Sequence, residues 1–187
     1  HLVLKALAEQ YEQADEIIIA DDGSDNLTAE CIAYWQQRSP TPIQHVWQPD
    51  EGFRAASIRN KAVLASTADY LIFLDGDCVP RQDFIQASKR LRQRGYFVDG
   101  QRVLLNKAFT YKTLTQRWPL HQWDTWQWFK VYCNGYCNRW LPFLSLPLYR
   151  YRSYRWRGVK GCNVAMWRDD VLAVNGWDEA FTGWGFE

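Results

Sequence analysis

The sequence has no long uninterrupted apolar run. No stretch of its 187 residues approaches the ~20 apolar residues that a membrane-spanning helix needs, and no charged segment followed by an apolar one opens the chain. We therefore expect neither a spanning helix nor a secretion signal, and we predict a cytoplasmic protein. With 47% hydrophobic residues, the chain can bury one sizeable core, which predicts a single domain.

Side chains that bind metal through nitrogen or sulfur are scarce. The chain has three histidines and five scattered cysteines, and an odd number of cysteines argues against a disulfide framework. Cys133 and Cys137 have C-x-x-x-C spacing, but no second pair follows at ligand spacing. A zinc site at this pair is thus a minor alternative to two ordinary thiols.

Acidic residues are scarce between residues 81 and 160, which hold 16 Lys and Arg against three Asp, whereas the rest of the chain holds 6 against 18. An acidic body therefore carries a basic segment. Aromatic residues alternate irregularly with these cations, as in QRWPLHQWDTWQWFK (116–130) and LYRYRSYRWRG (148–158).

This basic and aromatic composition leaves several interpretations open. The segment could bind acidic or phosphorylated sugars or rest at a membrane interface. Alternatively, its tryptophans form the core of a small subdomain with a solvated cationic face. A nucleic-acid-binding module is a further alternative, but acids elsewhere in the chain would repel phosphate, so we expect no nucleic-acid partner.

Helix and strand patterns alternate through the first half of the chain. Apolar periodicity predicts helices over 2–10, 27–37 and 55–66, and strands over 16–20, 43–47 and 70–74. A further helix is predicted over 168–174. Apolar strands without polar alternation, placed between helices, indicate a parallel sheet covered on both faces, and hence an α/β fold.

Acids gather at the end of the first predicted strand, in IIIADDGSD (17–25). A turn at Gly23 and a helix capped by Ser24 or Asp25 would explain the end of this segment, but not Asp21 and Asp22. Ligands of open parallel sheets bind outside the carboxyl ends of the strands. Asp22 is therefore a candidate ligand-binding residue.

A second acidic pair follows the strand predicted over 70–74, in YLIFLDGDCVP (70–80). Asp75 and Asp77 are two positions apart, so in extended backbone their carboxylates point the same way. Their repulsion is relieved by a divalent cation, and oxygen ligands favour Mg²⁺ or Mn²⁺ held together with phosphate. The alternative is a solvated acidic turn before Pro80.

The segment between the two acidic clusters, GFRAASIRNKA (52–62), carries arginines at the start of a predicted helix. A helix N-terminus favours anions, and Arg59 could contact a phosphate or pair with an acid at a strand end. An exposed surface arginine is the alternative.

Together with GCNVAMWRDDVLAVNGWDEAFTGWGFE (161–187), these segments resemble the family 2 glycosyltransferases, which have the GT-A nucleotide-sugar fold. The last segment is also similar to the galactosyltransferase and chondroitin polymerase type. The resemblance covers residues 1–90 and 158–187. It implies one GT-A domain over 1–187, with a nucleotide-binding half, an aromatic/basic insert on the acceptor side and an acceptor-side segment (1–94, 95–160 and 161–187).

The resemblance also implies roles for the acids and for Arg59. Asp22, with Asp21 beside it, is similar to the acid that reads the uracil of UDP. Asp75 is similar to the residue that contacts the ribose or the metal, and Asp77 to the metal ligand of the family's Asp-x-Asp motif. Arg59 is similar to the basic residue near the nucleotide.

The C-terminal motif GWGFE resembles the family's Trp-Gly-x-Glu-Asp, whose acids handle the acceptor sugar. This resemblance implies acceptor binding at Trp184 and Gly185, with Gly161 and Asn163 nearby in the substrate site, and a catalytic role for Glu187. The second acid of the motif, which serves as base, is not part of this sequence, so the base is not assigned.

The sequence begins within what resembles the family's first helix. We therefore expect a piece of a longer protein, in which a further strand occupies a central position of the sheet.

The resemblance implies a metal-dependent, inverting transfer of a sugar from a UDP-sugar to a hydroxyl of a saccharide or glycolipid acceptor, with Mn²⁺ or Mg²⁺. Synthesis of a bacterial cell-surface polysaccharide or lipopolysaccharide is the expected setting, with a peripheral contact at the inner face of the cytoplasmic membrane.

A haloacid-dehalogenase-like phosphotransferase with Asp75 as nucleophile is an alternative function. A transferase-like protein that only binds the sugar nucleotide is another.

Overall fold

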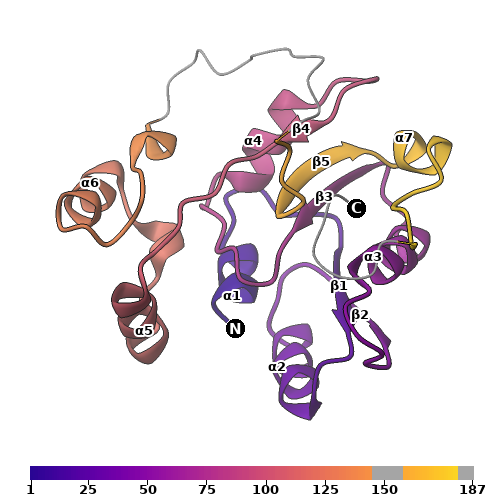
Figure 1. Ribbon diagram of the computed structural model, residues 1–187, viewed down its shortest axis with the longest axis horizontal. Helices are drawn as coiled ribbons and strands as arrows, with labels where there is room; N and C mark the ends of the chain where they lie inside the picture. Colours follow the sequence, from indigo (N-terminus) through magenta and orange to yellow (C-terminus); the bar gives the residue numbers. More distant parts are fainter. Residues whose placement is uncertain (145–157, 181–187) are drawn as a thin grey trace.

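The computed structural model describes residues 1–144 and 158–180. Helices and strands alternate along the first half (Figure 1), in the order α1 (Leu2–Ala8), β1 (Ile17–Asp22), α2 (Asn26–Gln36), β2 (Ile43–Gln48), α3 (Ala55–Ala65), β3 (Tyr70–Leu74) and α4 (Phe84–Leu91). The second half contains β4 (Val98–Asp99), α5 (Lys107–Gln116), η1 (Leu120–Gln122), α6 (Thr125–Cys133), η2 (Leu141–Phe143), β5 (Asn163–Trp167) and α7 (Arg168–Ala173).

Within residues 1–144 and 158–180, the strands form two small sheets. β1 and β2 are parallel and stay in register from the Ile17–Ile43 pair to the Asp22–Gln48 pair. β5 lies between β3 and β4 and is antiparallel to both. The prediction of an α/β fold with a parallel sheet and flanking helices is confirmed, and the antiparallel strands β4 and β5 are additions that the sequence pattern did not predict.

The predicted elements agree closely with those observed, with one consequential difference. β1 was expected to end at Ala20, but its pairing with β2 continues through Asp21 and Asp22. Both acids therefore belong to the strand and not to the turn after it. Successive strand residues face opposite sides of a sheet, so the two carboxylates point in different directions.

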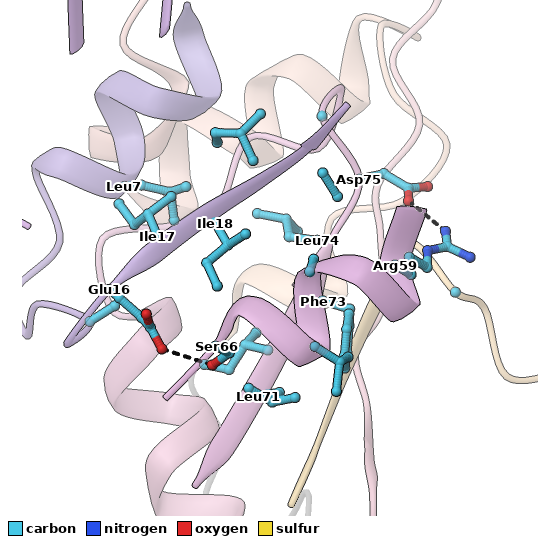
Figure 2. Close-up of a pocket in the computed structure, with 18 of the residues that line it drawn as sticks. Leu7, Glu16, Ile17, Ile18, Arg59, Ser66, Leu71, Phe73, Leu74 and Asp75 are labelled. Carbon is cyan, nitrogen blue, oxygen red and sulfur yellow. Dashed lines mark hydrogen bonds and ion pairs between the residues drawn. The ribbon is translucent and has the colours of Figure 1, made fainter. Parts of the chain in front are cut away.

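A cavity of about 1660 Å³ lies between β1 and β3, with α1 and α3 also contributing to its walls. Figure 2 shows Leu7, Ile18 and Leu71 among the apolar side chains around it. In the described residues, β1 and β3 each pair with a neighbour on one side only, and side chains of both strands line the cavity. The further central strand stays a prediction.

The segment predicted as an aromatic/basic insert (95–160) first contributes β4 to the sheet and then enters a helical lobe, residues 103–144, that lies to one side of the strands in Figure 1. Buried hydrophobic side chains form the core of this lobe (Phe109, Leu120, Trp128, Val131, Cys137 and Phe143). Trp118, Trp123 and Trp140 pack against that core, whereas Trp126 is 61% exposed.

Among the interpretations of these tryptophans, a subdomain core is therefore the one that fits most of the described tryptophans. Residues 145–157, which hold most of the second aromatic and basic stretch, lie outside the described residues.

The described cysteines give no support to a zinc site. Cys133 and Cys137 are free thiols, the first exposed and the second buried with its Sγ 3.3 Å from the Arg139 carbonyl oxygen. Burial raises the pKa of Cys137, which disfavours the thiolate that zinc requires. No helix within 1–144 and 158–180 is both long and apolar enough to cross a membrane.

Glu16, which directly precedes β1, is bonded to the turn between α3 and β3. This contact lies at the end of the cavity where β1 and β3 begin. Its Oε1 accepts hydrogen bonds from Ser66 Oγ at 2.7 Å, Thr67 N at 2.9 Å and Ala68 N at 3.0 Å, and Figure 2 shows the bond to Ser66. Burial raises the pKa of Glu16, but these hydrogen bonds together outweigh it and hold the pKa below the ordinary value.

Replacing Glu16 with Gln should lower the free energy of unfolding by about 1–3 kcal/mol near pH ~7, because the charged acceptor of several hydrogen bonds is lost. Folding lowers the pKa of Glu16, so its contribution is present above the ordinary value of 4.5 and disappears as the pH falls through the folded-state pKa. Urea denaturation over this pH range should show the wild type and Glu16→Gln converging in acid.

The exposed Glu30 on α2 provides the control, and Glu30→Gln should change the free energy of unfolding by less than about 0.5 kcal/mol. A loss of similar size in both variants, or one independent of pH, would contradict this role of Glu16.

Candidate active site

The two acids at the end of β1 have different surroundings. Asp21 is 5% exposed and is absent from the residues that line the cavity. Its Oδ2 lies 2.8 Å from His45 Nε2 on β2, and its Oδ1 accepts a hydrogen bond from Ser24 N at 2.8 Å. Burial raises the pKa of Asp21, but the bonds from Ser24 and His45 outweigh this effect and lower it. The structure thus places Asp21 in a buried contact between β1, β2 and the following turn.

Asp22 lines the cavity, and both of its carboxylate oxygens accept a hydrogen bond from the protein. Gln48 Nε2, at the end of β2, donates to Oδ1 at 2.6 Å, and the backbone N–H of Arg54 donates to Oδ2 at 2.6 Å. The Asp22 side chain is therefore held between β2 and the start of α3. Each carboxylate oxygen has a second lone pair, so Asp22 can still accept a hydrogen bond from a ligand.

Gly23 makes the tight turn that follows these acids. Its φ of +87° lies in the left-handed region, and a Cβ at this position would stand 2.5 Å from backbone atoms of Asp50. Glycine meets both demands. The helix after this turn is capped by Asp25, one of the two residues expected to do so, whose Oδ1 accepts a hydrogen bond from Thr28 N.

The second acidic pair lies at the end of β3, at the same cavity. Asp75 Oδ1 is 3.3 Å from Arg59 Nη2 on α3, a contact that Figure 2 shows. Its backbone N–H donates to the carbonyl oxygen of Cys162 at 3.0 Å, which fixes the strand end against the residue preceding β5. Asp77 is exposed at the mouth of the cavity. The arginine thus offsets part of the negative charge that accumulates there.

Cys78 follows Asp77 and its Sγ lies 3.4 Å from Asp77 Oδ1. Burial, together with Asp77 and Asp75, raises the pKa of Cys78 to about 12. The side chain is therefore a neutral thiol that donates to the carboxylate, and it is not a thiolate ligand.

The two described residues predicted for the acceptor side occupy different places. Gly161 lines the cavity, and a Cβ there would lie 3.6 Å from the guanidinium nitrogens of Arg59. Asn163 is the first residue of β5, opposite Leu74, and its side chain fills the space where a Cβ of Gly100 would be. The other predicted acceptor-side residues lie outside the described part of the chain: Trp184, Gly185 and Glu187.

Sequence reasoning placed Asp22, Arg59, Asp75, Asp77 and Gly161 at one site, and in the structure all five line one cavity, while their roles stay predictions. It missed three polar residues that the structure adds: His45, which holds Asp21; Gln48, which holds Asp22; and Lys160, which lines the cavity. Gln48 is the one of the three that the sequence signals. It is a polar residue at the buried end of a strand, and the chain continues from there directly into the arginine segment.

The side chains of Asp75 and Asp77 fit a hard divalent cation that a ligand shares. Mg²⁺ and Mn²⁺ take oxygen donors, and they are commonly held by one or two carboxylates together with phosphate oxygens. Within the described ranges, no cluster of three or more His, Cys, Asp or Glu forms a metal site made by protein alone. Any cation here would thus need oxygens from a bound ligand.

The chain was compared with known proteins. The model of glycosyl transferase family 2 matches residues 2–170. Validoxylamine A glucosyltransferase from Streptomyces hygroscopicus subsp. jinggangensis is 25% identical over 92% of this chain and 42% of the relative. Chondroitin synthase from Escherichia coli is 26% identical over the whole chain and 28% of the relative. The chain therefore spans less than half the length of these curated relatives.

Replacing Gly23 with Ala should destabilise the fold by about 2 kcal/mol or more, because a side chain there combines a left-handed backbone with a clash against Asp50. Gly76 is the matched control, since it also follows an acid at a strand end but a Cβ there meets nothing within 4 Å. Thermal or urea unfolding should separate the two variants. Equal stabilities of Gly23→Ala and Gly76→Ala would show that the turn relaxes without cost.

Proposed function

Because the chain belongs to glycosyl transferase family 2, we propose that it transfers a sugar from a UDP-sugar to a hydroxyl of a saccharide or glycolipid acceptor, with Mn²⁺ or Mg²⁺ as cofactor. One observation carries this proposal. Asp22 at the end of β1, and Asp75 and Asp77 after β3, line a single cavity together with the cation of Arg59. Acids from separate strands thus converge on a space that can hold a nucleotide.

In the proposed donor complex, the uracil lies at Asp22 and the diphosphate at the mouth of the cavity. The carboxylates of Asp75 and Asp77 would hold the cation, which when bound stabilises the charge on the departing diphosphate. Arg59 and Lys160 line the same cavity and add positive charge on the protein side. These two cations would bind diphosphate oxygens and orient the donor sugar toward the acceptor.

The acceptor side of the proposal rests on the C-terminal segment. Glu187, with Trp184 and Gly185, would bind the acceptor sugar, and a carboxylate of the same motif would remove the proton from the attacking hydroxyl. In-line attack from the face opposite the diphosphate would invert the anomeric centre. Gly161 would lie between the two substrates, since it lines the same cavity as Arg59.

The relatives support a hexose as the transferred group and a saccharide-like acceptor. One is named for glucosyl transfer to validoxylamine A and another for chondroitin synthesis. Synthesis of a cell-surface polysaccharide or lipopolysaccharide remains part of the proposal, as does a cytoplasmic protein with a peripheral membrane contact. The arginines that would make this contact lie outside the described residues: Arg150, Arg152, Arg155 and Arg157.

The alternatives that the sequence left open receive less support. A phosphotransferase would need Asp75 as an attacking nucleophile, but Asp75 pairs with Arg59, and the match to the glycosyl transferase family includes this motif. Nucleic acid binding is disfavoured by the acids that line the cavity. A protein that binds sugar nucleotide without transferring it would give the same binding results, and product formation by the full-length protein separates the two.

Calorimetric titration of the full-length protein with UDP, GDP and CDP, with and without Mn²⁺, tests the donor site. We expect UDP to bind best and to require the cation, and Asp77→Ala to weaken UDP binding by about tenfold or more, because a carboxylate ligand of the cation is lost. Transfer from UDP-sugars, followed by release of UDP, should fall in parallel.

Asp25→Asn is the matched control. It removes an exposed carboxylate at the turn after β1, close in sequence to Asp22, but keeps a side chain that caps α2 well. UDP binding that is indifferent to Mn²⁺, or equal in Asp77→Ala and Asp25→Asn, would rule out the proposed metal site.

A further inference from the structure

Asn60 on α3 binds the backbone of Trp177 through both ends of its side-chain amide. Trp177 N donates to Asn60 Oδ1 at 2.9 Å, and Asn60 Nδ2 donates to the Trp177 carbonyl oxygen at 2.9 Å. The same Nδ2 also donates to Glu179 Oε1 at 2.8 Å. These contacts connect residues 117 and 119 positions apart in the sequence, so they are a tertiary clamp.

The chain before Trp177 is shaped to receive this side chain. Asn175 and Gly176 both have positive φ, at 64° and 73°, which turns the backbone sharply after α7. A Cβ on Gly176 would stand 2.3 Å from Asn60 Oδ1, so the turn leaves room for the amide to reach the backbone. Glycine at this position therefore serves the clamp as well as the turn.

Hydrophobic packing fixes the ring of Trp177 in the same place. Its ring centroid lies 4.4 Å from that of Phe73 on β3, in an edge-to-face arrangement. Trp177 also packs against the buried cluster of Val63, Leu71 and Val171. The clamp and the ring together hold residue 177 against α3 and β3.

Asn60 follows Arg59 directly, and the two residues serve different sides of the candidate active site. Arg59 pairs with Asp75 and lines the cavity, as Gly161 does. Asn60 holds Trp177, after which the sequence continues into the motif that carries Trp184, Gly185 and Glu187. One turn of one helix is thus bonded to Asp75 on the donor side and to Trp177 within the acceptor-side segment.

We propose that Asn60 is a positioning residue that sets the acceptor-side segment relative to the donor site. This inference rests on the proposed function. An amide is needed because the side chain must both accept from the Trp177 N–H and donate to the Trp177 carbonyl. Aspartate would lose the donor and place a second carboxylate beside Glu179, and alanine would lose both bonds.

The test compares Asn60→Ala in the full-length protein with Lys61→Ala, an exposed neighbour on the same helix. Asn60→Ala should reduce the rate of sugar transfer by about tenfold or more, while UDP affinity and slow hydrolysis of the UDP-sugar by water change by less than about twofold. Transfer needs the positioned acceptor, whereas UDP binding and hydrolysis do not. Lys61→Ala should leave all three unchanged.

Two further readouts separate positioning from a general loss of structure. Amide hydrogen exchange in Asn60→Ala should become faster from Trp177 onward and stay unchanged in α3. Asn60→Asp should be as defective as Asn60→Ala, and adding Glu179→Gln should restore part of the transfer rate, because the new amide can donate to the carboxylate.

Equal losses of transfer, hydrolysis and UDP affinity in Asn60→Ala would overturn the proposal and leave Asn60 a residue of the fold. Unchanged hydrogen exchange from Trp177 onward would overturn it as well. Absence of any transfer by the wild type, with UDP still bound, would instead contradict the proposed function and remove the basis for this role.

Discussion

Electrostatic repulsion among the acids at the ends of β1 and β3 is the constraint around which this part of the molecule is built. The three less exposed acids each have nitrogen partners, whereas the exposed Asp77 has the Cys78 thiol. His45 and Ser24 hold Asp21, Gln48 and the backbone of Arg54 hold Asp22, and Arg59 holds Asp75. These partners offset part of the negative charge that the acids bring together. Asp77, at the mouth of the cavity, keeps carboxylate oxygens for a ligand.

Helix α3 supplies the connections among these elements. The backbone N–H of Arg54, at its N-terminal end, binds Asp22 of β1; Arg59 binds Asp75 after β3; and Asn60 binds Trp177 after α7. Helix and strand backbones are stiff, so fixing α3 in this way fixes the strand ends relative to one another. The candidate donor site and Trp177 of the acceptor-side segment are thus positioned by a single element.

Much of this arrangement could be read from the sequence because it depends on local patterns. Apolar runs between amphipathic segments specified β1, β2 and β3, and acids at the ends of such runs must meet where parallel strands end together. The features that the sequence did not predict depend on contacts between segments that are distant in the sequence. Strand β5 pairs antiparallel with β3 across about 90 residues of chain, and nothing local in GCNVAMW distinguishes it from a loop or helix end.

The opposite orientations of Asp21 and Asp22 were missed for a related reason. They depend on β1 continuing two residues further through its pairing with β2, which fixes the face of each side chain. The tryptophans of the helical lobe were ambiguous in the sequence because burial and surface binding both use aromatic residues. Packing around Phe109 and Trp128 decides for burial in most described cases.

The central claim is that Asp22 and Asp77, from separate strand ends, bind the two ends of one nucleotide diphosphate through its base and its cation. A crystal structure of the full-length protein with UDP and Mn²⁺ tests this most directly. The account predicts an anomalous manganese peak at the carboxylates of Asp77 and Asp75, with the uracil at Asp22. UDP bound outside the cavity, or manganese away from both carboxylates, would contradict it.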